Sequence, residues 1–429
     1  MKRWSVVVAV VAVAFSLPAW CGDLVFSEDF ESGDTSGWWA PARVGETGQK
    51  TCFDEDGEVI VCAATGQDGD IQPGVAWPNP RFVDNNDGTV SDMLTGLIWL
   101  KDASCSELPG TNSSGKADWT EAFAASVALE DDICDLSDGS VAGDWRLPSY
   151  FELKSLVNLE FFMPALSDAA GTAQWSNGDV FSGVPLSGSV WSSTSEARLP
   201  YTAWDVEFYY GSGFDSSKTV NNYVWPVRGG QWAPARVGET GQKSCYTEDG
   251  TPIPCEETGQ DGDYQPGVAW PNPRFVDNND GTVSDMLTGL IWLKDASCDG
   301  LLDTDETGHG PWATALTACA TLATGSCGLS DGSVAGDWRL PSILELESLL
   351  NLEFHGPALS DASGTAQWSE GDPFSEVIWG DEMSDSYWSS TTGVDISTRA
   401  WRMELVNGFG LRNAQKTWDL LIWPVRGGR

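Results

Sequence analysis

The clearest amphipathic pattern follows Asp144-Trp145-Arg146-Leu147-Pro148-Ser149, a hexapeptide that returns unchanged at residues 337–342. Its proline favours an extended residue before it, and its serine begins a Ser-x-x-Glu capping box that Glu152 completes. The apolar residues that follow fall at i, i+3 and i+4 and form one stripe: Leu153, Leu156 and Val157. The sequence therefore predicts a helix that begins after this serine, once in each half of the chain.

Other patterns predict strands around two helices. Apolar residues at helical spacing predict a first helix over 119–129, and the continuous apolar run 97–100 predicts a buried strand. Asn86-Asp87-Gly88 favours a tight turn, and alternation from Trp204 to Tyr210 favours a half-buried strand. Strands, two helices and returning strands indicate an α+β domain built of short antiparallel strands.

The chain is a tandem duplication. We expect one copy over 39–230 and a second over 231–429, each long enough to hold its own core. The copies differ in length and sequence mainly at 182–190 against 375–387, and again at 211–222 against 408–420. Variable loops on a constant framework are the expected place of recognition.

The N-terminal residues indicate export. A basic start, an apolar run and small residues near Ala19 predict a signal peptide over residues 1–21, with cleavage after Ala19 or Cys21. Residues 22–38 read as an acidic, Gly-rich linker, and no later apolar run reaches membrane-spanning length. The sequence predicts a secreted, periplasmic or cell-surface protein without a transmembrane segment, and it leaves oligomerisation open.

Charge and histidine content narrow the function. The formal net charge of -40 disfavours nucleic acids, anionic lipids and sulfated polysaccharides as partners. Only two histidines are present, His309 and His355, and both lie in the second half. A histidine-dependent catalytic centre common to both copies is therefore excluded.

Eight of the ten cysteines match between the copies at an offset of 193 residues. Cys52 and Cys62 bracket a turn, which favours a local disulfide and leaves a Cys105–Cys134 pair. By analogy, we expect Cys245–Cys255 and Cys298–Cys327, although four cysteines allow three pairings. Cys319 has no counterpart and is expected to be a buried free thiol.

Ordered motifs in both copies carry a family resemblance. In the first copy they are Thr47–Cys52, Gly66–Asp68, Asp87–Asp92, Thr95–Trp99, Asp144–Pro148, Trp191–Thr194 and Val227-Arg228. The pattern resembles the C-terminal domain of the Legionella collagen-like adhesin, and more distantly formylglycine-generating enzymes. The resemblance implies two tandem C-type-lectin-like domains, although this chain lacks a collagen-like stretch and is strongly acidic.

Oxygen-rich turns are candidate cation sites, and calcium is the only cofactor considered. Calcium takes six to eight oxygen ligands, and six residues of the two turns could supply some of them: Asp84, Asn86, Asp92, Asp277, Asn279 and Asp285. The alternative, which we favour, is a hairpin turn in which Asn and Asp bond their own backbone.

The variable loops supply the candidate ligand contacts. Most of the 23 tryptophans fall in strand or helix patterns and are expected in the core. Two in or beside the variable loops, with nearby carboxylates, are the candidate ligand-binding residues: Trp379, Asp381, Glu382, Asp385 and Trp418. Arg146 and Arg228 are expected to pair with acids such as Asp144 and to be structural.

These observations predict a non-catalytic surface adhesin or secreted binding protein that recognises an unknown glycan or protein. One alternative is an enzyme of the formylglycine-generating type, but its chemistry needs reactive cysteines and these are better placed for disulfides. The other alternative is a structural envelope protein without a soluble ligand.

Overall fold

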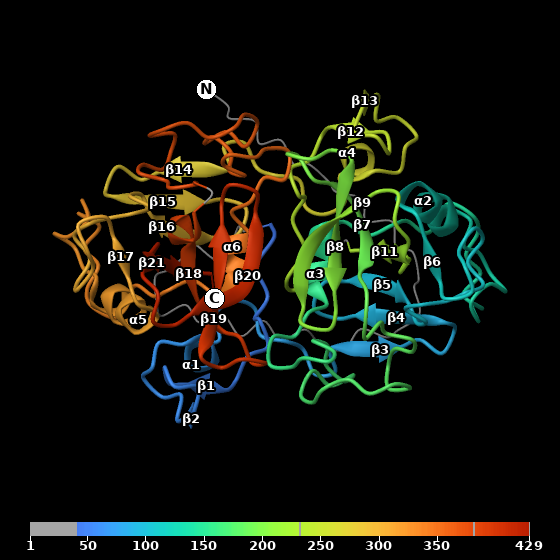
Figure 1. Ribbon diagram of the computed structural model, residues 1–429, viewed down its shortest axis with the longest axis horizontal. Coiled ribbons are helices and arrows are strands. Elements are labelled where there is room, and N and C mark those ends of the chain that lie inside the picture. Colours follow the sequence, from blue (N-terminus) through green and yellow to red (C-terminus); the bar gives the residue numbers. More distant parts are fainter. Residues whose placement is uncertain (1–40, 231–232, 381, 429) are drawn as a thin grey trace, which may run out of the picture. The chain divides into compact units, whose positions relative to one another are not determined.

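The computed structural model describes residues 41–230, 233–380 and 382–428 (Figure 1). The predicted signal peptide, the whole of the predicted linker and Asp381 lie outside these ranges. Within them the chain is mostly β, with a few short helices, and no helix there is both long and apolar enough to cross a bilayer.

The same succession of elements occurs twice. The first copy contains β1 (Cys52–Phe53), β2 (Val59–Ile60), α1 (Asp68–Ile71), β3 (Phe82–Asp84), β4 (Thr89–Asp92), β5 (Leu97–Leu100), β6 (Lys116–Ala117), α2 (Trp119–Val127), α3 (Tyr150–Ser155), β7 (Val190–Ser195), β8 (Thr202–Glu207), β9 (Ser212–Ser217), β10 (Asn222–Tyr223) and β11 (Val227–Gly229). The second contains β12 (Cys245–Tyr246), β13 (Pro252–Ile253), α4 (Asp261–Tyr264), β14 (Phe275–Asp277), β15 (Thr282–Asp285), β16 (Leu290–Leu293), β17 (His309–Gly310), α5 (Trp312–Thr321), α6 (Ile343–Glu347), η2 (Met383–Asp385), β18 (Tyr387–Thr392), β19 (Arg399–Glu404), β20 (Phe409–Gln415), β21 (Leu420–Leu421) and β22 (Val425–Gly427).

Each copy has a two-stranded hairpin, a four-stranded sheet and a five-stranded sheet. In the first copy the larger sheets have the orders β11-β5-β4-β3 and β6-β10-β7-β8-β9. All neighbours are antiparallel except β10 and β7. Val227 pairs with Trp99 across β11 and β5, so the end of the copy closes the sheet that its early strands began.

The two capped helices form as their sequence predicts. Ser149 accepts a hydrogen bond from the Glu152 backbone and Glu152 accepts one from the Ser149 backbone, and Ser342 with Glu345 repeats this box. Leu153, Leu156 and Val157 are buried, although α3 ends at Ser155.

Arg146 pairs with the capping glutamate and not with Asp144. Its Nη1 and Nη2 atoms each lie 2.6 Å from a Glu152 carboxylate oxygen, and Arg339 holds Glu345 in the same way. Asp144 instead accepts a hydrogen bond from the Val141 backbone. The guanidinium is planar and matches two carboxylate oxygens at once, so the pair fixes the start of the helix.

Disulfides join the four pairs expected from the sequence: Cys52–Cys62, Cys105–Cys134, Cys245–Cys255 and Cys298–Cys327. Cys319 is the one free cysteine of the described residues and is fully buried, and burial raises the pKa of its thiol far above its ordinary value. Disulfides persist in oxidising compartments, so these pairs fit an extracellular or secreted protein.

The two copies exchange their N-terminal hairpins. Gln49, which precedes β1, donates to the backbone carbonyl of Thr392 in β18 and accepts from its N–H, both at 2.9 Å. Gln242 makes the same pair of hydrogen bonds with Ser195 in β7, both at 2.8 Å. Each hairpin unit is therefore hydrogen-bonded to the five-stranded sheet of the other copy.

The copies also share their core. The described residues form one compact unit, and its main group of buried apolar residues is continuous from one copy to the other. At the seam, the rings of Trp204 and Phe409 lie 4.5 Å apart, and Lys154 Nζ lies 3.1 Å from a Glu347 carboxylate oxygen with both side chains buried. The expectation that each copy holds a separate core does not hold, and the domain boundaries at 39, 230 and 231 remain predictions.

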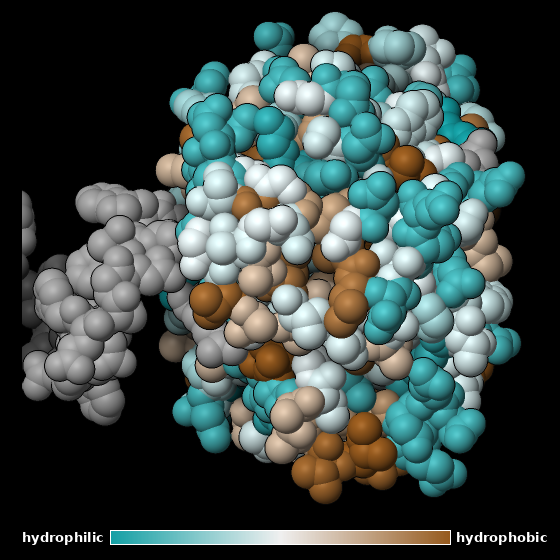
Figure 2. Space-filling view, turned by 90° about the vertical axis from the view of Figure 1, so that its left-hand side faces the viewer, coloured by the Kyte–Doolittle hydropathy of each residue, from teal (hydrophilic) through white to brown (hydrophobic). Residues whose placement is uncertain are grey.

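The surface reflects the excess of carboxylates. Figure 2 shows one face that is mostly hydrophilic, with apolar residues gathered at its lower edge, at the height of the β1–β2 hairpin. In that hairpin region Val59 and Val61 are 70% and 83% exposed.

Candidate functional site

The oxygen-rich turns take hairpin geometry. Asn86 and Gly88 have positive φ values of 61° and 86°, and Asp84 Oδ1 accepts a hydrogen bond from the Asn86 N–H at 2.9 Å. Asp84 Oδ2 lies 2.6 Å from Lys101 Nζ, and Asp277 lies 2.7 Å from Lys294 in the second copy. The lysine hydrogen bond lowers the pKa of Asp84 against the raising effect of burial.

The third candidate ligand of each turn points elsewhere. Asp92 is buried beside Arg81 and accepts hydrogen bonds from Thr95 Oγ1 and the Leu94 N–H, both at 2.9 Å, and Asp285 has the same surroundings. Among the described residues no group of three or more His, Cys, Asp or Glu is arranged to hold a metal ion. The arrangement favours the hairpin interpretation, and the calcium alternative stays untested.

The structure brings together only part of the predicted loop site. Glu382 and Asp385 share one turn, where Asp385 Oδ2 accepts the Glu382 N–H at 3.3 Å. Trp379 is 41% exposed and its ring lies over Gly356, whereas Trp418 is partly buried against the core. Asp381 lies outside the described residues. Trp379 is therefore the one aromatic residue of this set that is largely open to solvent.

A surface hollow of about 500 Å³ lies in the first copy, at the place that corresponds to Trp379 and its surroundings in the second copy. It is lined by Met163 and Pro164, by residues 175–177, by the variable loop at 183–186 and by Tyr223. Met163 and Leu186 are 50% and 49% exposed, so apolar side chains stand at its rim. The variable loop thus faces the segment that ends at Pro164, and Trp379 meets the corresponding segment of the second copy.

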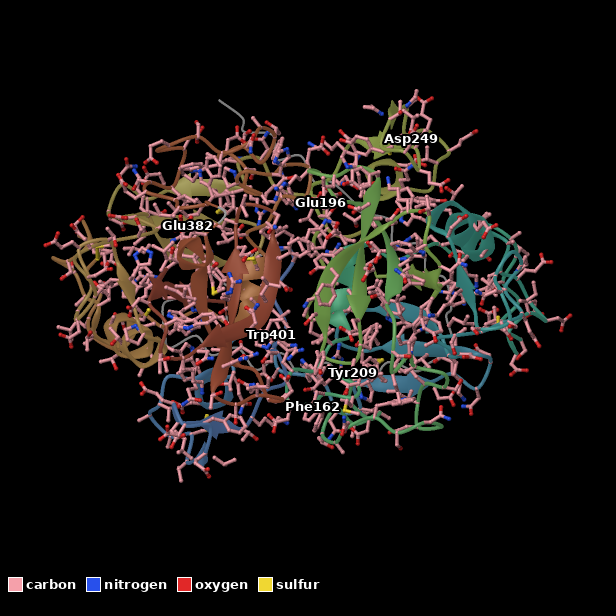
Figure 3. The ribbon with its side chains drawn as sticks, in the orientation of Figure 1. Phe162, Glu196, Tyr209, Asp249, Glu382 and Trp401 are labelled. Atoms are coloured by element: carbon pink, nitrogen blue, oxygen red, sulfur yellow. A yellow bond between two sulfur atoms is a disulfide. The ribbon has the colours of Figure 1, made fainter. Side chains whose placement is uncertain are left out.

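An aromatic group adjoins the segment that lines this hollow, with Phe162 exposed and Tyr209 and Tyr210 half-buried; Phe162 and Tyr210 themselves line a small cleft at the seam with Asp395 and Arg412. Phe162 is 39% exposed, and its neighbour Met163 donates its N–H to the carbonyl of Tyr209 at 2.7 Å. Figure 3 shows Phe162 and Tyr209 next to each other. The rings of Tyr209 and Tyr210 pack edge to face at 4.3 Å, and the Arg412 guanidinium of the second copy lies 3.4 Å from the Tyr210 ring centroid. We call Phe162, Tyr209 and Tyr210 the aromatic ledge.

The second copy keeps the backbone of the ledge and changes its side chains. The Gly356 N–H donates to the Val406 carbonyl at 2.7 Å, as Met163 does to Tyr209. His355 and Val406 stand where the first copy has Phe162 and Tyr209. The ledge is therefore a property of the first copy and not of the duplicated framework.

An apolar cleft also lies along the seam. It has a volume of about 110 Å³, and every residue that lines it has its counterpart from the other copy, including the facing segments 42–46 and 235–239. Lys154 and Glu347 occupy equivalent positions in the two copies. They are the only equivalent positions in this lining at which the copies carry opposite charges. We regard the cleft as part of the packing between copies.

Two buried aspartates make contacts between the copies that the sequence interpretation did not predict, since it considered Asp68 only as a weaker oxygen ligand of the calcium kind. Asp68 Oδ2 accepts hydrogen bonds from Thr47 at 2.8 Å and from Thr391 of the other copy at 2.5 Å. Asp261 does the same with Thr240 at 2.7 Å and Thr194 at 2.5 Å. Burial raises the pKa of each carboxyl to about 7, against the lowering effect of the threonine hydroxyls. Each motif is visible in the sequence, but nothing local indicates that an aspartate from one copy meets a strand of the other.

The model of one protein family, the Lcl C-terminal domain, matches residues 88–228 and again residues 281–426. The chain belongs to this family. No curated protein sequence matches the chain. Both Lcl matches begin after the exchanged hairpins, so the hydrogen bonds that Gln49 and Gln242 contribute come from outside the matched segments.

Proposed function

We propose that the chain is an exported, non-catalytic binding protein of adhesin type, made of two C-type-lectin-like domains. The observation that carries the proposal is that all eight matched cysteines form disulfides, while the remaining thiol, Cys319, is buried. A formylglycine-type oxidation needs a reactive, accessible cysteine pair, and a protonated buried thiol is a poor nucleophile.

Membership of the Lcl family is compatible with a surface role, and the differences between copies support recognition. The framework repeats closely, whereas the loops and the ledge vary. Such variation is typical of ligand contacts carried by a rigid scaffold. Trp379, Glu382 and the hollow of the first copy are the places where we expect contacts.

Two measurements test this proposal. Peptide mapping under non-reducing conditions should find the four disulfides and one free thiol, whereas free thiols at Cys105 and Cys134 would favour the enzyme. Binding of the mature protein to arrays of glycans and extracellular proteins should then give a saturable ligand. Failure to bind any component, with the disulfides intact, would favour the structural envelope alternative.

A further inference from the structure

We propose that the hollow of the first copy, together with the aromatic ledge, binds an uncharged glycan. This inference rests on the binding function proposed above and narrows it to one site and one class of ligand. It stands on three features of the molecule: the neutral side chains that line the hollow, the difference between the copies at one lining position, and the aromatic ledge, which adjoins the hollow through Met163.

The side chains that line the hollow are uncharged, and the charged groups next to them are Lys116, whose Nζ lies 4.2 Å from the ring centroid of Tyr223, and Asp102, which adjoins Gly183. The lining residues are apolar, aromatic, or neutral and polar, with Ser176 and Asn177 as the side-chain hydrogen-bonding groups besides the Tyr223 hydroxyl. The whole chain carries 63 acidic residues, so an uncharged recess of about 500 Å³ is a marked departure from the average surface. Its volume lies in the range of sites for small molecules.

The two copies differ at one lining position of the hollow. Asn177 Oδ1 accepts the N–H of Gly183 at 3.3 Å and so braces the variable loop. At the equivalent position Glu370 accepts the N–H of Glu376 at 3.0 Å. The framework therefore accommodates a carboxylate at this position, and the first copy carries the neutral amide instead. An amide can both donate and accept hydrogen bonds to hydroxyl groups, whereas a carboxylate only accepts.

The exposed ring of Phe162 and the half-buried ring of Tyr209 suit the apolar faces of pyranose rings. Phe162 and Tyr209 adjoin the rim through Met163, which lines the hollow itself. Arg412 is neutralised by its ion pair with Asp395, so the ledge offers no free guanidinium for a sulfate or carboxylate. Aromatic faces next to neutral hydrogen-bonding groups match a molecule that has both CH faces and hydroxyls.

The charge of the chain selects among glycans. A formal net charge of -40 repels sulfated and uronic-acid polymers at long range. An uncharged hexose or N-acetylhexosamine chain meets no such repulsion and exposes the groups that the hollow can bond. The observations therefore favour a neutral glycan over an anionic one.

The test uses the mature protein with its disulfides intact. Neutral hexasaccharides of β-linked glucose, N-acetylglucosamine and mannose, with heparin as the anionic comparator, are titrated by calorimetry. We expect saturable binding of at least one neutral hexasaccharide and no binding of heparin. Asn177→Asp, which keeps the acceptor for Gly183 and adds a charge, should weaken that binding about tenfold. The paired substitution Phe162→Ala with Tyr209→Ala should weaken it at least fivefold.

Matched changes in the second copy serve as controls. His355→Ala with Val406→Ala, and Glu370→Gln, should leave the affinity of the first-copy site for the neutral hexasaccharide unchanged, and thermal unfolding checks that every variant is folded. If Asn177→Asp does not fold, the Phe162 and Tyr209 variant decides. Equal affinity of wild type and folded first-copy variants would overturn the inference. Binding of heparin or of a protein alone, without any neutral hexasaccharide, would also overturn it while leaving the proposed binding function in place.

Discussion

Replacing both buried aspartates with asparagine should remove a large part of the pH dependence of stability. Burial raises the pKa of Asp68 and Asp261 to about 7, from an ordinary value of 3.8. A carboxyl whose pKa is raised on folding contributes its full stability below the unfolded value, and that contribution is lost as the pH rises through about 7. The protein should therefore unfold more easily at pH 8 than at pH 5.

The magnitude follows from the shift. Each unit of pKa difference corresponds to about 1.4 kcal/mol, so a shift of about three units sets an upper limit of about 4 kcal/mol for each site. Asp68 Oδ1 and Asp261 Oδ1 have no hydrogen-bond partner among the described residues, so no hydrogen bond to that oxygen offsets the buried charge. Asparagine keeps one acceptor oxygen for the threonines but places an unpaired amide there, at a cost of about 1–3 kcal/mol.

The assay is urea unfolding of the oxidised protein at pH 5 and pH 8. The wild type should lose several kcal/mol of unfolding free energy between the two, and the double variant Asp68→Asn with Asp261→Asn should lose much less. Asp70→Asn is the control, because Asp70 lies in the same helix but is only partly buried. Equal pH dependence in the wild type and the double variant would refute the reasoning. Other buried acids such as Asp205 titrate in both proteins, so they cannot produce a difference between them.

Three further predictions concern the seam, a disulfide and a turn. Lys154→Glu should destabilise the protein by about 3–5 kcal/mol in urea unfolding because it places two carboxylates together. Adding Glu347→Lys should restore most of this, and no recovery would contradict the role of the pair. Replacing Cys105–Cys134 with serines should cost about 3–4 kcal/mol by the same measurement, and an unchanged midpoint would show that the closed loop contributes nothing. Millimolar calcium should leave the melting temperature unchanged because the Asp84 carboxylate already forms an ion pair with Lys101. A rise in melting temperature that Asp84→Asn abolishes would establish the calcium site.

Features set by neighbouring residues could be predicted from the sequence. The capping boxes at Ser149 and Ser342 depend on residues three positions apart, and both form. The buried strand at 97–100 and the helix that begins at Trp119 follow from their periodicity in the same way. The partner of Arg146 was predicted wrongly because Asp144 is closer in sequence, whereas the guanidinium reaches the glutamate that the cap has already placed.

The exchange of hairpins could not be predicted, since its signals are the same in both copies. Gln49 and Gln242 have matching surroundings in sequence, and the strands that receive them are also alike. Local patterns therefore indicate that such a unit packs on such a strand, but they cannot indicate which copy supplies it. The hollow was missed for a related reason, because its lining comes from four separate segments whose approach depends on tertiary structure.

One difference between the copies does carry information about how they pack at the seam. The helices α3 and α6 occupy equivalent positions, yet one carries Lys154 where the other carries Glu347, and these side chains face each other while buried. Two identical copies joined in this way would bury two lysines or two glutamates together, and like charges at such a distance are strongly unfavourable. Fusion of the copies into one chain removes that constraint, because each side of the seam can then change alone. The same freedom allows one copy to carry Asn177 and the ledge while the other carries Glu370, so that the asymmetry of the seam and the asymmetry of the proposed ligand site have one physical origin.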